Sequence, residues 1–221
     1  MRLVVFDLDH TLLSGDSDVL WCEFLLARGL LDRTAFAERN AQVEEGYRAG
    51  SITPLEFSEF YLLTLAGRTR AQCDPLRAAF MAEEIVPRIP AAARALVDAH
   101  SRRDELLVMS TATNRYLSEL TAVELGFEHL IATEPEEAGG VFTGRSHAVL
   151  NMREGKVARL RDWLAVAGRP PDLLAQATFY SDSFNDLALL QVVRQPVAVD
   201  PDARLLAHAK AQGWRVVRLE R

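Results

Sequence analysis

The chain begins with a short apolar stretch that ends at two carboxylates. Leu3 to Phe6 is an unbroken run of apolar residues, and Asp7 and Asp9 follow it directly. Such a run is typical of a parallel strand that is covered on both faces. In open α/β sheets ligands bind at the carboxyl ends of the strands, and residues two apart in an extended chain point the same way. The pattern therefore predicts a central strand that presents two carboxylates at a binding site.

After Asp16 the apolar positions recur at helical spacing. We expect four helices: one ending at Gly29, one between Asp32 and Gly50, one from Thr53 to Gly67, and one that follows Asp74-Pro75 and reaches about Glu84. Asp or Thr at the start, Glu three residues after Thr53, and Gly at the end are the signals on which these bounds rest. This helical stretch is longer than a crossover between parallel strands requires. Residues 17–85 are therefore predicted to form an inserted helical cap.

The remaining residues alternate between helical and strand patterns. We expect helices at 91–101, 115–125, 157–166 and 202–212, and strands at 106–110, 129–132, 141–144, 197–199 and 214–219, with another strand that ends at Ser181. This alternation predicts an α/β fold with a doubly wound parallel sheet. Residues 1–16 and 86–221 would form this core domain, with residues 17–85 as an all-helical cap subdomain.

Composition and charge narrow the class of protein. The 221 residues are 49% hydrophobic and 25% charged, as in ordinary globular proteins, and the net charge is −6 without a long basic block, so no nucleic-acid partner is expected. Cys22 and Cys73 have neither the spacing of a zinc site nor the number of a disulfide framework. No long apolar run occurs, and Asp7 and Asp9 stand where a signal peptide would be apolar. We therefore expect a cytoplasmic protein without a membrane partner; the sequence specifies no oligomeric state.

Hydroxyl and basic side chains lie at the ends of two later elements. The strand at 106–110 runs through Thr111 into a helix, and a hydroxyl beside the N–H groups of a helix amino terminus can bind an anion. Lys156 follows Gly155 at the start of another helix, where a cation is favourable only beside an anion. The alternatives are an ordinary helix cap for Thr111 and a solvent-exposed side chain for Lys156.

Another predicted strand end carries further carboxylates. Asp182 follows the strand that ends at Ser181, and Asn185 and Asp186 lie in the next turn. Acids that are crowded at one edge of a sheet need a counter-charge, and ligand sets made only of oxygen suit Mg²⁺. In such a site one carboxylate can act as nucleophile or metal ligand while a second, two residues on, transfers a proton at the same centre.

With these segments in order, the chain resembles the haloacid dehalogenase superfamily, and within it the phosphoserine-phosphatase-like branch with an inserted helical cap. The matching segments are Phe6-Asp7-Leu8-Asp9-His10-Thr11-Leu12, the strand that ends at Thr111 with Ser110 as the rival alignment, Lys156, and Asp182-Ser183-Phe184-Asn185-Asp186. These segments span nearly the whole chain. One such motif alone would be weak evidence for the resemblance, but four in the correct order are specific evidence. The resemblance implies a haloacid-dehalogenase-like α/β core whose cap closes over the site.

The resemblance also implies a role for each motif residue. Asp7 would be the nucleophile that forms an aspartyl-phosphate, and Asp9 the acid that protonates the leaving oxygen and then activates water. Thr111 and Lys156 would hold phosphoryl oxygens. Mg²⁺ would be bound by Asp7, the backbone carbonyl of Asp9 and Asp182, while Asp186 and Asn185 orient the metal shell and the phosphate.

The expected activity is Mg²⁺-dependent hydrolysis of a small phosphorylated metabolite. Asp16 lies where phosphoserine phosphatases place an acid that meets the substrate amine, which indicates an amino-alcohol phosphate such as phosphoserine or histidinol phosphate. Asp16 could equally cap the helix that begins near Ser17. Arg39 and Arg48 are candidates to meet a substrate carboxylate, and His10 is interpreted as a local structural choice. The alternative functions are a phosphotransferase or mutase of the same superfamily, and a non-catalytic regulator that binds metal or metabolite.

Overall fold

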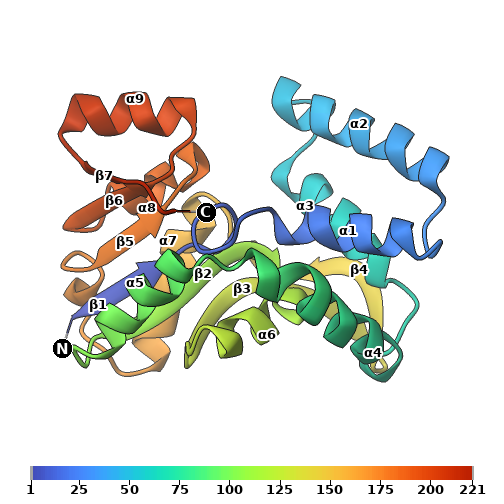
Figure 1. The fold of residues 1–221 in the computed structure, drawn as a ribbon, viewed down its shortest axis with the longest axis horizontal. Helices are drawn as coiled ribbons and strands as arrows, with labels where there is room; N and C mark the ends of the chain where they lie inside the picture. The colour runs from blue at the N-terminus through green and yellow to red at the C-terminus, as the bar shows by residue number, and fades with distance from the viewer. Residues whose placement is uncertain (1, 221) are drawn as a thin grey trace.

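The computed structural model describes residues 2–220, apart from the side chains of Glu44 and Arg48. Within this range the strands form a seven-stranded sheet in the order β4-β3-β2-β1-β5-β6-β7 (Figure 1). The strands are β1 (Leu3–Phe6), β2 (Leu106–Asn114), β3 (His129–Ala138), β4 (Val141–His147), β5 (Thr178–Ser181), β6 (Gln195–Val199) and β7 (Arg215–Val217). Neighbours pair in parallel except β3 and β4, which are antiparallel. The predicted α/β fold is confirmed.

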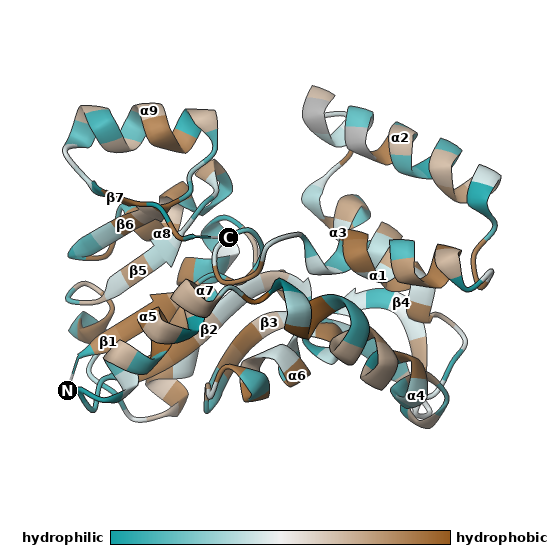
Figure 2. Cartoon of the chain, in the orientation of Figure 1, coloured by the Kyte–Doolittle hydropathy of each residue, from teal (hydrophilic) through white to brown (hydrophobic). Residues whose placement is uncertain are grey.

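Helices cover both faces of the sheet. The helices of the core are α5 (Ala91–Ser101), α6 (Arg115–Glu124), α7 (Glu154–Val166), α8 (Leu187–Leu190) and α9 (Ala203–Gln212). Val4 and Phe6 of β1 belong to the apolar cluster that includes α5 and α6, whereas Leu3 and Val5 belong to the cluster with α7, α8 and α9. Successive side chains of a strand point to opposite faces, so β1 is buried on both sides, as its apolar run predicts (Figure 2). The chain that leaves β1 is thus held at the centre of the sheet.

Residues 17–85 are mainly helical, as expected. They form α1 (Ser17–Ala27), α2 (Arg33–Ala49), α3 (Pro54–Leu62) and α4 (Arg70–Phe80), with a short 3₁₀ turn at Leu63–Leu65 and a π turn at Met81–Ile85. The 3₁₀ turn Val86–Arg88 follows this stretch. The Asp32 side chain caps α2, and Gly50 ends it in the left-handed conformation. Thr53 and Glu56 form the predicted capping box of α3. The starts of these two helices are confirmed because each rests on a side chain that satisfies free backbone N–H groups there. α3 ends at Leu62, before the expected Gly67, and a 3₁₀ turn follows it.

The predicted start of the fourth helix is wrong. We expected it after Asp74-Pro75, but α4 begins at Arg70 and carries Pro75 in its interior. Thr69 and Gln72 form a capping box in which each side chain accepts a hydrogen bond from the other residue's backbone N–H. The box satisfies amides at the start of the helix, whereas Pro75 removes only one internal hydrogen bond. The capping signal therefore prevails over the proline.

The helical stretch has a core that is partly its own and partly shared with the sheet. Cys22, Val43, Phe60 and Tyr61 form a small apolar cluster between α1, α2 and α3. Other large side chains of α1, such as Trp21, belong to the cluster that also contains Phe6 of the central strand. α1 and α4 are therefore packed against the core domain, and α3 packs on strand β4 of the sheet. The division into a core of residues 1–16 and 86–221 and a cap of residues 17–85 stays a prediction.

Four predicted strands, β2, β3, β4 and β6, are longer in the structure because the sheet continues beyond the apolar runs. β3 and β4 reach Ala138 and His147 as an antiparallel hairpin that extends beneath the helical stretch (Figure 1). Phe142 of β4 exchanges backbone hydrogen bonds of 2.9 Å with Arg68 and Gly67. These bonds occupy backbone groups that an edge strand otherwise exposes.

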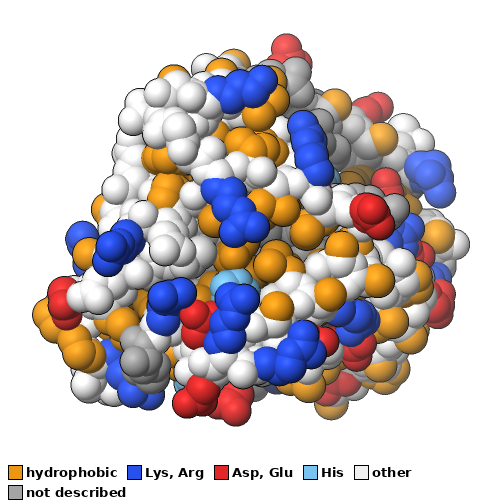
Figure 3. Space-filling model, turned by 60° about the vertical axis from the view of Figure 1, so that its left-hand side comes forward, with side chains coloured by type: hydrophobic (Ala, Val, Ile, Leu, Met, Phe, Trp, Pro, Cys, Tyr) orange, Lys and Arg blue, Asp and Glu red, His pale blue; other side chains and the backbone are white. Residues whose placement is uncertain are grey.

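The surface agrees with the absence of a basic block in the sequence. On the face that Figure 3 shows, Lys and Arg side chains are dispersed among apolar and acidic ones rather than gathered in one patch. Among residues 2–220, no helix combines the length and the apolar character that a membrane span requires.

Candidate active site

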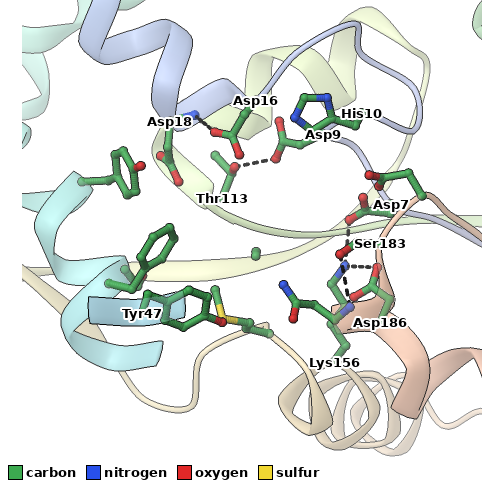
Figure 4. A pocket seen from close by; sticks show the side chains of 17 residues that line it. Asp7, Asp9, His10, Asp16, Asp18, Tyr47, Thr113, Lys156, Ser183 and Asp186 are labelled. Atoms are coloured by element: carbon green, nitrogen blue, oxygen red, sulfur yellow. Dashed lines mark hydrogen bonds and ion pairs between the residues drawn. The ribbon is translucent and has the colours of Figure 1, made fainter. Parts of the chain in front are cut away.

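The carboxyl end of β1 carries a buried ion-pair network. The backbone N–H of Asp7 donates to the carbonyl of Tyr180 at 2.9 Å, which ties Asp7 to β5. Lys156 Nζ lies 2.7 Å from Asp7 Oδ1 and 2.7 Å from Asp186 Oδ2 (Figure 4). The Ser181 hydroxyl donates to the same Asp186 oxygen at 2.7 Å. Three of the predicted site residues, far apart in sequence, are therefore in direct contact.

Lys156 lies in the first turn of α7 and only 3% of it is exposed, so the alternative of a solvent-exposed lysine is wrong. Burial lowers its pKa, but the carboxylates of Asp186 and Asp7 raise it more, and the net pKa lies above the ordinary value. The preceding Gly155 explains how this turn reaches so far inward. A Cβ atom there would lie 2.1 Å from the carbonyl oxygen of Leu150, so a larger residue would displace the start of α7.

Asp9 is held from two sides by hydrogen bonds to its carboxylate. Its Oδ1 accepts from the backbone N–H of Ser17 at 2.8 Å and from the Ser17 hydroxyl at 2.5 Å. Its Oδ2 accepts from the hydroxyls of Thr111 at 3.2 Å and Thr113 at 2.7 Å. Asp9 therefore joins the amino terminus of α1 to the carboxyl end of β2.

The two rival hydroxyls at the end of β2 have different surroundings. Both Ser110 and Thr111 are fully buried. The Ser110 hydroxyl accepts a hydrogen bond from Asn151, whereas the Thr111 hydroxyl donates to Asp9. The pocket itself is lined by Thr113, two residues further along the strand. The contact with Asp9 favours Thr111 over Ser110, and its binding of a phosphoryl oxygen stays a prediction.

Asp182 lies beside Asp7 through a shared hydroxyl. Thr11 Oγ1 is 3.3 Å from Asp7 Oδ2 and 3.0 Å from Asp182 Oδ1. Burial, together with the repulsion of nearby Asp186, raises the pKa of Asp182 to about 7 against the hydrogen bond from Thr11. The pKa of Asp7 also lies well above its ordinary value. Burial raises it most, Lys156 lowers it, and repulsion from Asp186, Asp182 and Asp9 raises it again. The carboxylates here lack sufficient positive charge to balance them.

A divalent cation fits this donor set. Within the described part of the chain, no three Asp, Glu, His or Cys side chains converge as a closed metal site. Mg²⁺ does not require one, because it keeps several waters and is commonly held by one or two carboxylates plus substrate oxygens. Asp7 and Asp182 are two such carboxylates in one pocket, and Thr11 contacts both. The excess of buried negative charge is what a bound cation would neutralise.

All these carboxylates line one cavity of about 230 Å³. This is smaller than the roughly 300–1,000 Å³ of pockets that take drug-sized ligands, so the cavity suits a small metabolite. Figure 4 shows Asp7, Lys156 and Asp186 on one side, with Asp16 and Asp18 away from them at the start of α1. The rest of the lining includes Asn185, His10, Met152 and the aromatic residues Tyr47, Phe57 and Tyr61 of α2 and α3.

Asp16 and Asp18 bring two more acids to the cavity. Asp16 is the N-cap of α1, and its Oδ1 accepts from the backbone N–H groups of Asp18 at 2.9 Å and Val19 at 3.0 Å. The capping role considered for Asp16 is therefore confirmed, and Oδ2 is not used by the cap. Burial, with repulsion from Asp9, raises the pKa of Asp16 to about 7. Asp18, which accepts from Asn114 Nδ2 at 3.3 Å, also has a pKa well above its ordinary value because of burial and the nearby acids.

Tyr47 connects α2 to the loop before α7. Its hydroxyl accepts from Arg153 at 2.6 Å and donates to Met152 Sδ at 3.6 Å. Since Tyr47 and Met152 both line the cavity, this contact closes it on the side of the helical stretch. Arg39 lies elsewhere, in a groove with Phe36 and Arg145, and the side chain of Arg48 lies outside the described residues. His10 lines the cavity with a positive φ of 54°, in keeping with a local structural role.

Several residues at the site were not identified from the sequence. Thr113 could have been found, because residues two apart on an extended strand share a face and Thr111 was already a candidate. Asp18 stands two residues after Asp16, but a helix begins between them and the strand rule does not apply. Tyr47 and Asn151 carry no local signal, since their contacts are with residues far away in the sequence.

Fold and site together define an α/β enzyme with a carboxylate at the end of its central strand, a lysine that bridges two carboxylates, and a second acid two residues after the first. A family model described as haloacid dehalogenase-like hydrolase matches residues 4–191. The chain belongs to this family. The predicted family and the predicted enzyme class, a phosphatase of the hydrolase type, are confirmed.

Curated relatives cover almost the whole chain. A histidinol-phosphatase from Neisseria meningitidis is 37% identical over 218 residues, which is 98% of either chain. A phosphoserine phosphatase from Mycobacterium tuberculosis is 30% identical over 96% of this chain and 68% of its own length.

Solved structures show the same architecture. A protein of unknown function from Bordetella pertussis Tohama I has a TM-score of 0.93 at 38% identity, covering 98% of each chain. A phosphoserine phosphatase solved as a phospho-aspartyl intermediate analogue has a TM-score of 0.68 at 13% identity, covering 100% of this chain and 93% of the other. At that identity the second likeness concerns the fold alone.

Proposed function

We propose that the protein is a cytoplasmic, Mg²⁺-dependent phosphomonoesterase that acts on a small phosphorylated metabolite through an aspartyl-phosphate. The observation that carries the proposal is the buried bridge of Lys156 between Asp7 and Asp186 at the end of β1. In this bridge Asp7, the proposed nucleophile, contacts a cation, and Asp9 lines the same cavity. Phosphoryl transfer requires little more than such positioning and the neutralisation of charge.

In the proposed reaction Asp7 attacks phosphorus while Asp9 supplies a proton. The bond from phosphorus to the leaving oxygen breaks as a carboxylate oxygen of Asp7 binds phosphorus, and Asp9 protonates the departing alkoxide. Asp9 then takes a proton from a water molecule that attacks the aspartyl-phosphate, which releases phosphate, restores the Asp7 carboxylate and returns Asp9 to its protonated form. Asp9 suits this shuttle because the hydroxyls of Ser17, Thr111 and Thr113 hold its carboxylate in place.

The remaining polar groups would neutralise and orient the phosphate. Lys156 contributes positive charge, and Asn185, which lines the cavity, is a proposed hydrogen-bonding partner of the phosphoryl oxygens. Thr111 is the second proposed partner, and its hydroxyl would turn to the phosphate from Asp9. Mg²⁺, held by Asp7, the backbone carbonyl of Asp9 and Asp182, would supply Lewis-acid neutralisation of the phosphoryl charge. Asp186 would keep Lys156 oriented, as its 2.7 Å contact supports.

We further propose that the substrate is an amino-alcohol phosphate, with histidinol phosphate as the first candidate. The part of the cavity away from Asp7 combines the acids Asp16 and Asp18 with the rings contributed by α2 and α3, a set that favours a cationic amine attached to a flat group. Among the lining residues that the structure describes, Lys156 is the one Lys or Arg, and two carboxylates already engage it. This favours a substrate without a carboxylate over phosphoserine. The curated relative named histidinol-phosphatase supports the same choice.

A substrate panel tests the activity directly. Phosphate release would be measured from histidinol phosphate, phosphoserine, phosphoethanolamine and sugar phosphates, with Mg²⁺ or with EDTA. We expect release that requires Mg²⁺ and is fastest for histidinol phosphate. Release that depends on an added alcohol acceptor would identify a phosphotransferase instead, and folded protein that binds Mg²⁺ without any release would identify a regulator.

We predict that Asp18→Asn changes substrate choice rather than general activity. A charge-assisted hydrogen bond contributes about 1.5–3 kcal/mol, so kcat/KM for histidinol phosphate should fall about 10- to 100-fold. The variant should hydrolyse an analogue of histidinol phosphate that lacks the amino group almost as fast as the wild type does. Glu23→Gln removes one charge from an exposed position of the same helix and is the matched control. Equal losses for the two substrates would refute a role for Asp18 in binding the amine.

We also predict that Mg²⁺ stabilises the protein more at pH 8 than at pH 6. The raised pKa of Asp182, about 7 against an ordinary 3.8, stabilises the metal-free fold at low pH. That stabilisation is lost as the pH rises through about 7, because the folded protein must then release the proton. Mg²⁺ binds the deprotonated form and should restore about 2–3 kcal/mol at a hundredfold excess over its Kd. Thermal unfolding with Mg²⁺ or EDTA measures this shift. Asp182→Asn should abolish it, and an equal shift at both pH values would contradict the prediction.

A further inference from the structure

The end of β2 departs from regular pairing just where its hydroxyls reach Asp9. The pairs of β2 with β3 are Val108 with His129, Met109 with Leu130, Ser110 with Ile131, and then Asn114 with Thr133. Residues 111–113 of β2 therefore lie opposite residue 132 alone, which makes this stretch a bulge. Bulges beside active sites redirect side chains, and here Thr111 and Thr113 both donate to Asp9 Oδ2. A bulge of this size lacks ladder hydrogen bonds and needs another support.

Asn151 provides contacts on both strands at this bulge. Its side-chain Nδ2 lies 2.9 Å from the carbonyl oxygen of Thr111 on β2 and 2.9 Å from that of Ile131 on β3. The same nitrogen lies 3.1 Å from the Ser110 hydroxyl, and the backbone N–H of Asn151 donates to the Thr133 hydroxyl at 3.2 Å. Asn151 is fully buried and belongs to no strand. It therefore substitutes for the interrupted ladder.

The orientation of the Asn151 amide follows from its partners. Backbone carbonyls only accept hydrogen bonds, so the NH₂ group must face Thr111 and Ile131. Oδ1 is left buried without a hydrogen-bond partner among the described residues. A carboxylate at this position would face two carbonyl oxygens and could not form these bonds. The site thus requires a side chain that donates to both strands.

We propose that Asn151 is a positioning residue that holds the bulge of β2 in the shape that directs Thr111 and Thr113 at Asp9. It thereby sets Asp9 for proton transfer to the leaving oxygen. The proposal rests on the phosphatase function proposed above, and it adds a residue that has no contact with the substrate. Its consequence is a dependence on the leaving group, because a well-placed acid matters for an alkoxide and little for a leaving group that departs without a proton.

The test compares two substrates in Asn151→Ala. Because kcat/KM reports the steps up to cleavage of the ester, hydrolysis of the aspartyl-phosphate does not enter it. We expect kcat/KM for histidinol phosphate to fall about 30-fold or more, and that for p-nitrophenyl phosphate about 3-fold or less. Asn151→Ser keeps one donor and should give an intermediate loss with the same selectivity. Thr133→Val removes the acceptor of the backbone N–H of Asn151 but leaves the contacts of the Asn151 side-chain amide in place. It should lower kcat/KM for both substrates equally and only weakly.

Equal losses for the two substrates in Asn151→Ala, or no loss, would overturn the proposal. A second readout does not depend on activity. Hydrogen exchange of the backbone amides at residues 110–114 should accelerate in Asn151→Ala and remain as in the wild type in Ser110→Ala, which removes only the hydroxyl contact. Unchanged exchange would overturn the bracing role. A wild type that hydrolyses neither substrate would refute the proposed function instead. Accelerated exchange in Asn151→Ala would still support the role of Asn151 in holding the bulge of β2.

Discussion

Asp7→Asn should abolish turnover while leaving the fold intact. Asparagine has the same shape as aspartate but cannot form the acyl phosphate, so we expect kcat to fall by about 10⁴-fold or more, as when other covalent nucleophiles are removed. The fold should survive because Lys156 keeps its contact with Asp186. The substitution also removes one charge from a group of buried acids that repel each other. Mass spectrometry after an acid quench should find a phosphorylated Asp7 peptide in the wild type and none in the variant.

The matched control is Asp162→Asn, which makes the same change at an exposed position of α7. It should retain wild-type rates. Thermal unfolding of both variants separates chemistry from folding, since Asp7→Asn is expected to melt no lower than the wild type without metal. Substantial phosphate release by folded Asp7→Asn would eliminate the covalent mechanism. It would leave Asp7 as a metal ligand and would require water to attack the substrate directly.

Local signals were sufficient for much of this fold. The apolar run before Asp7 and the caps at Asp32 and Thr53 each satisfy a physical requirement within a few residues, and the structure has them where expected. The error at α4 has the same origin. Two local signals disagree there, the proline at 75 and the capping box that begins at Thr69, and the proline, on which the predicted start rests, is the weaker of the two.

The site was predictable to the extent that its residues end strands. Asp7, Asp182 and the hydroxyls near the carboxyl end of β2 meet because the carboxyl ends of parallel strands lie at one edge of a sheet. Tyr47 and Asn151 reach the site from a helix and a loop, and their positions depend on how the chain packs as a whole. A hydrophobic pattern identifies which face of a helix is buried but not what that face contacts.

Asp9→Asn should separate the two halves of the reaction. For alkyl phosphates we expect kcat/KM to fall about 10²- to 10⁴-fold, because the alkoxide departs without a proton. For p-nitrophenyl phosphate the first step should be nearly unaffected while hydrolysis of the aspartyl-phosphate slows. Rapid mixing should then show a burst of p-nitrophenol followed by slow turnover, with phosphorylated Asp7 accumulating. The fold should tolerate the change, since the hydroxyls of Thr111 and Thr113 can rotate to accept from the new NH₂ group.

Combining Asp9→Asn with Asn151→Ala connects this prediction to the structure of β2. If Asn151 acts through the bulge on Asp9, the double variant should hydrolyse alkyl phosphates about as slowly as Asp9→Asn alone. The acid that Asn151 positions is already absent in Asp9→Asn. Residues that act independently would give losses that multiply. Multiplied losses would therefore place Asn151 outside the Asp9 pathway, even if each single variant were impaired. A missing burst in Asp9→Asn would mean that Asp9 is needed before the ester bond breaks, whatever the leaving group.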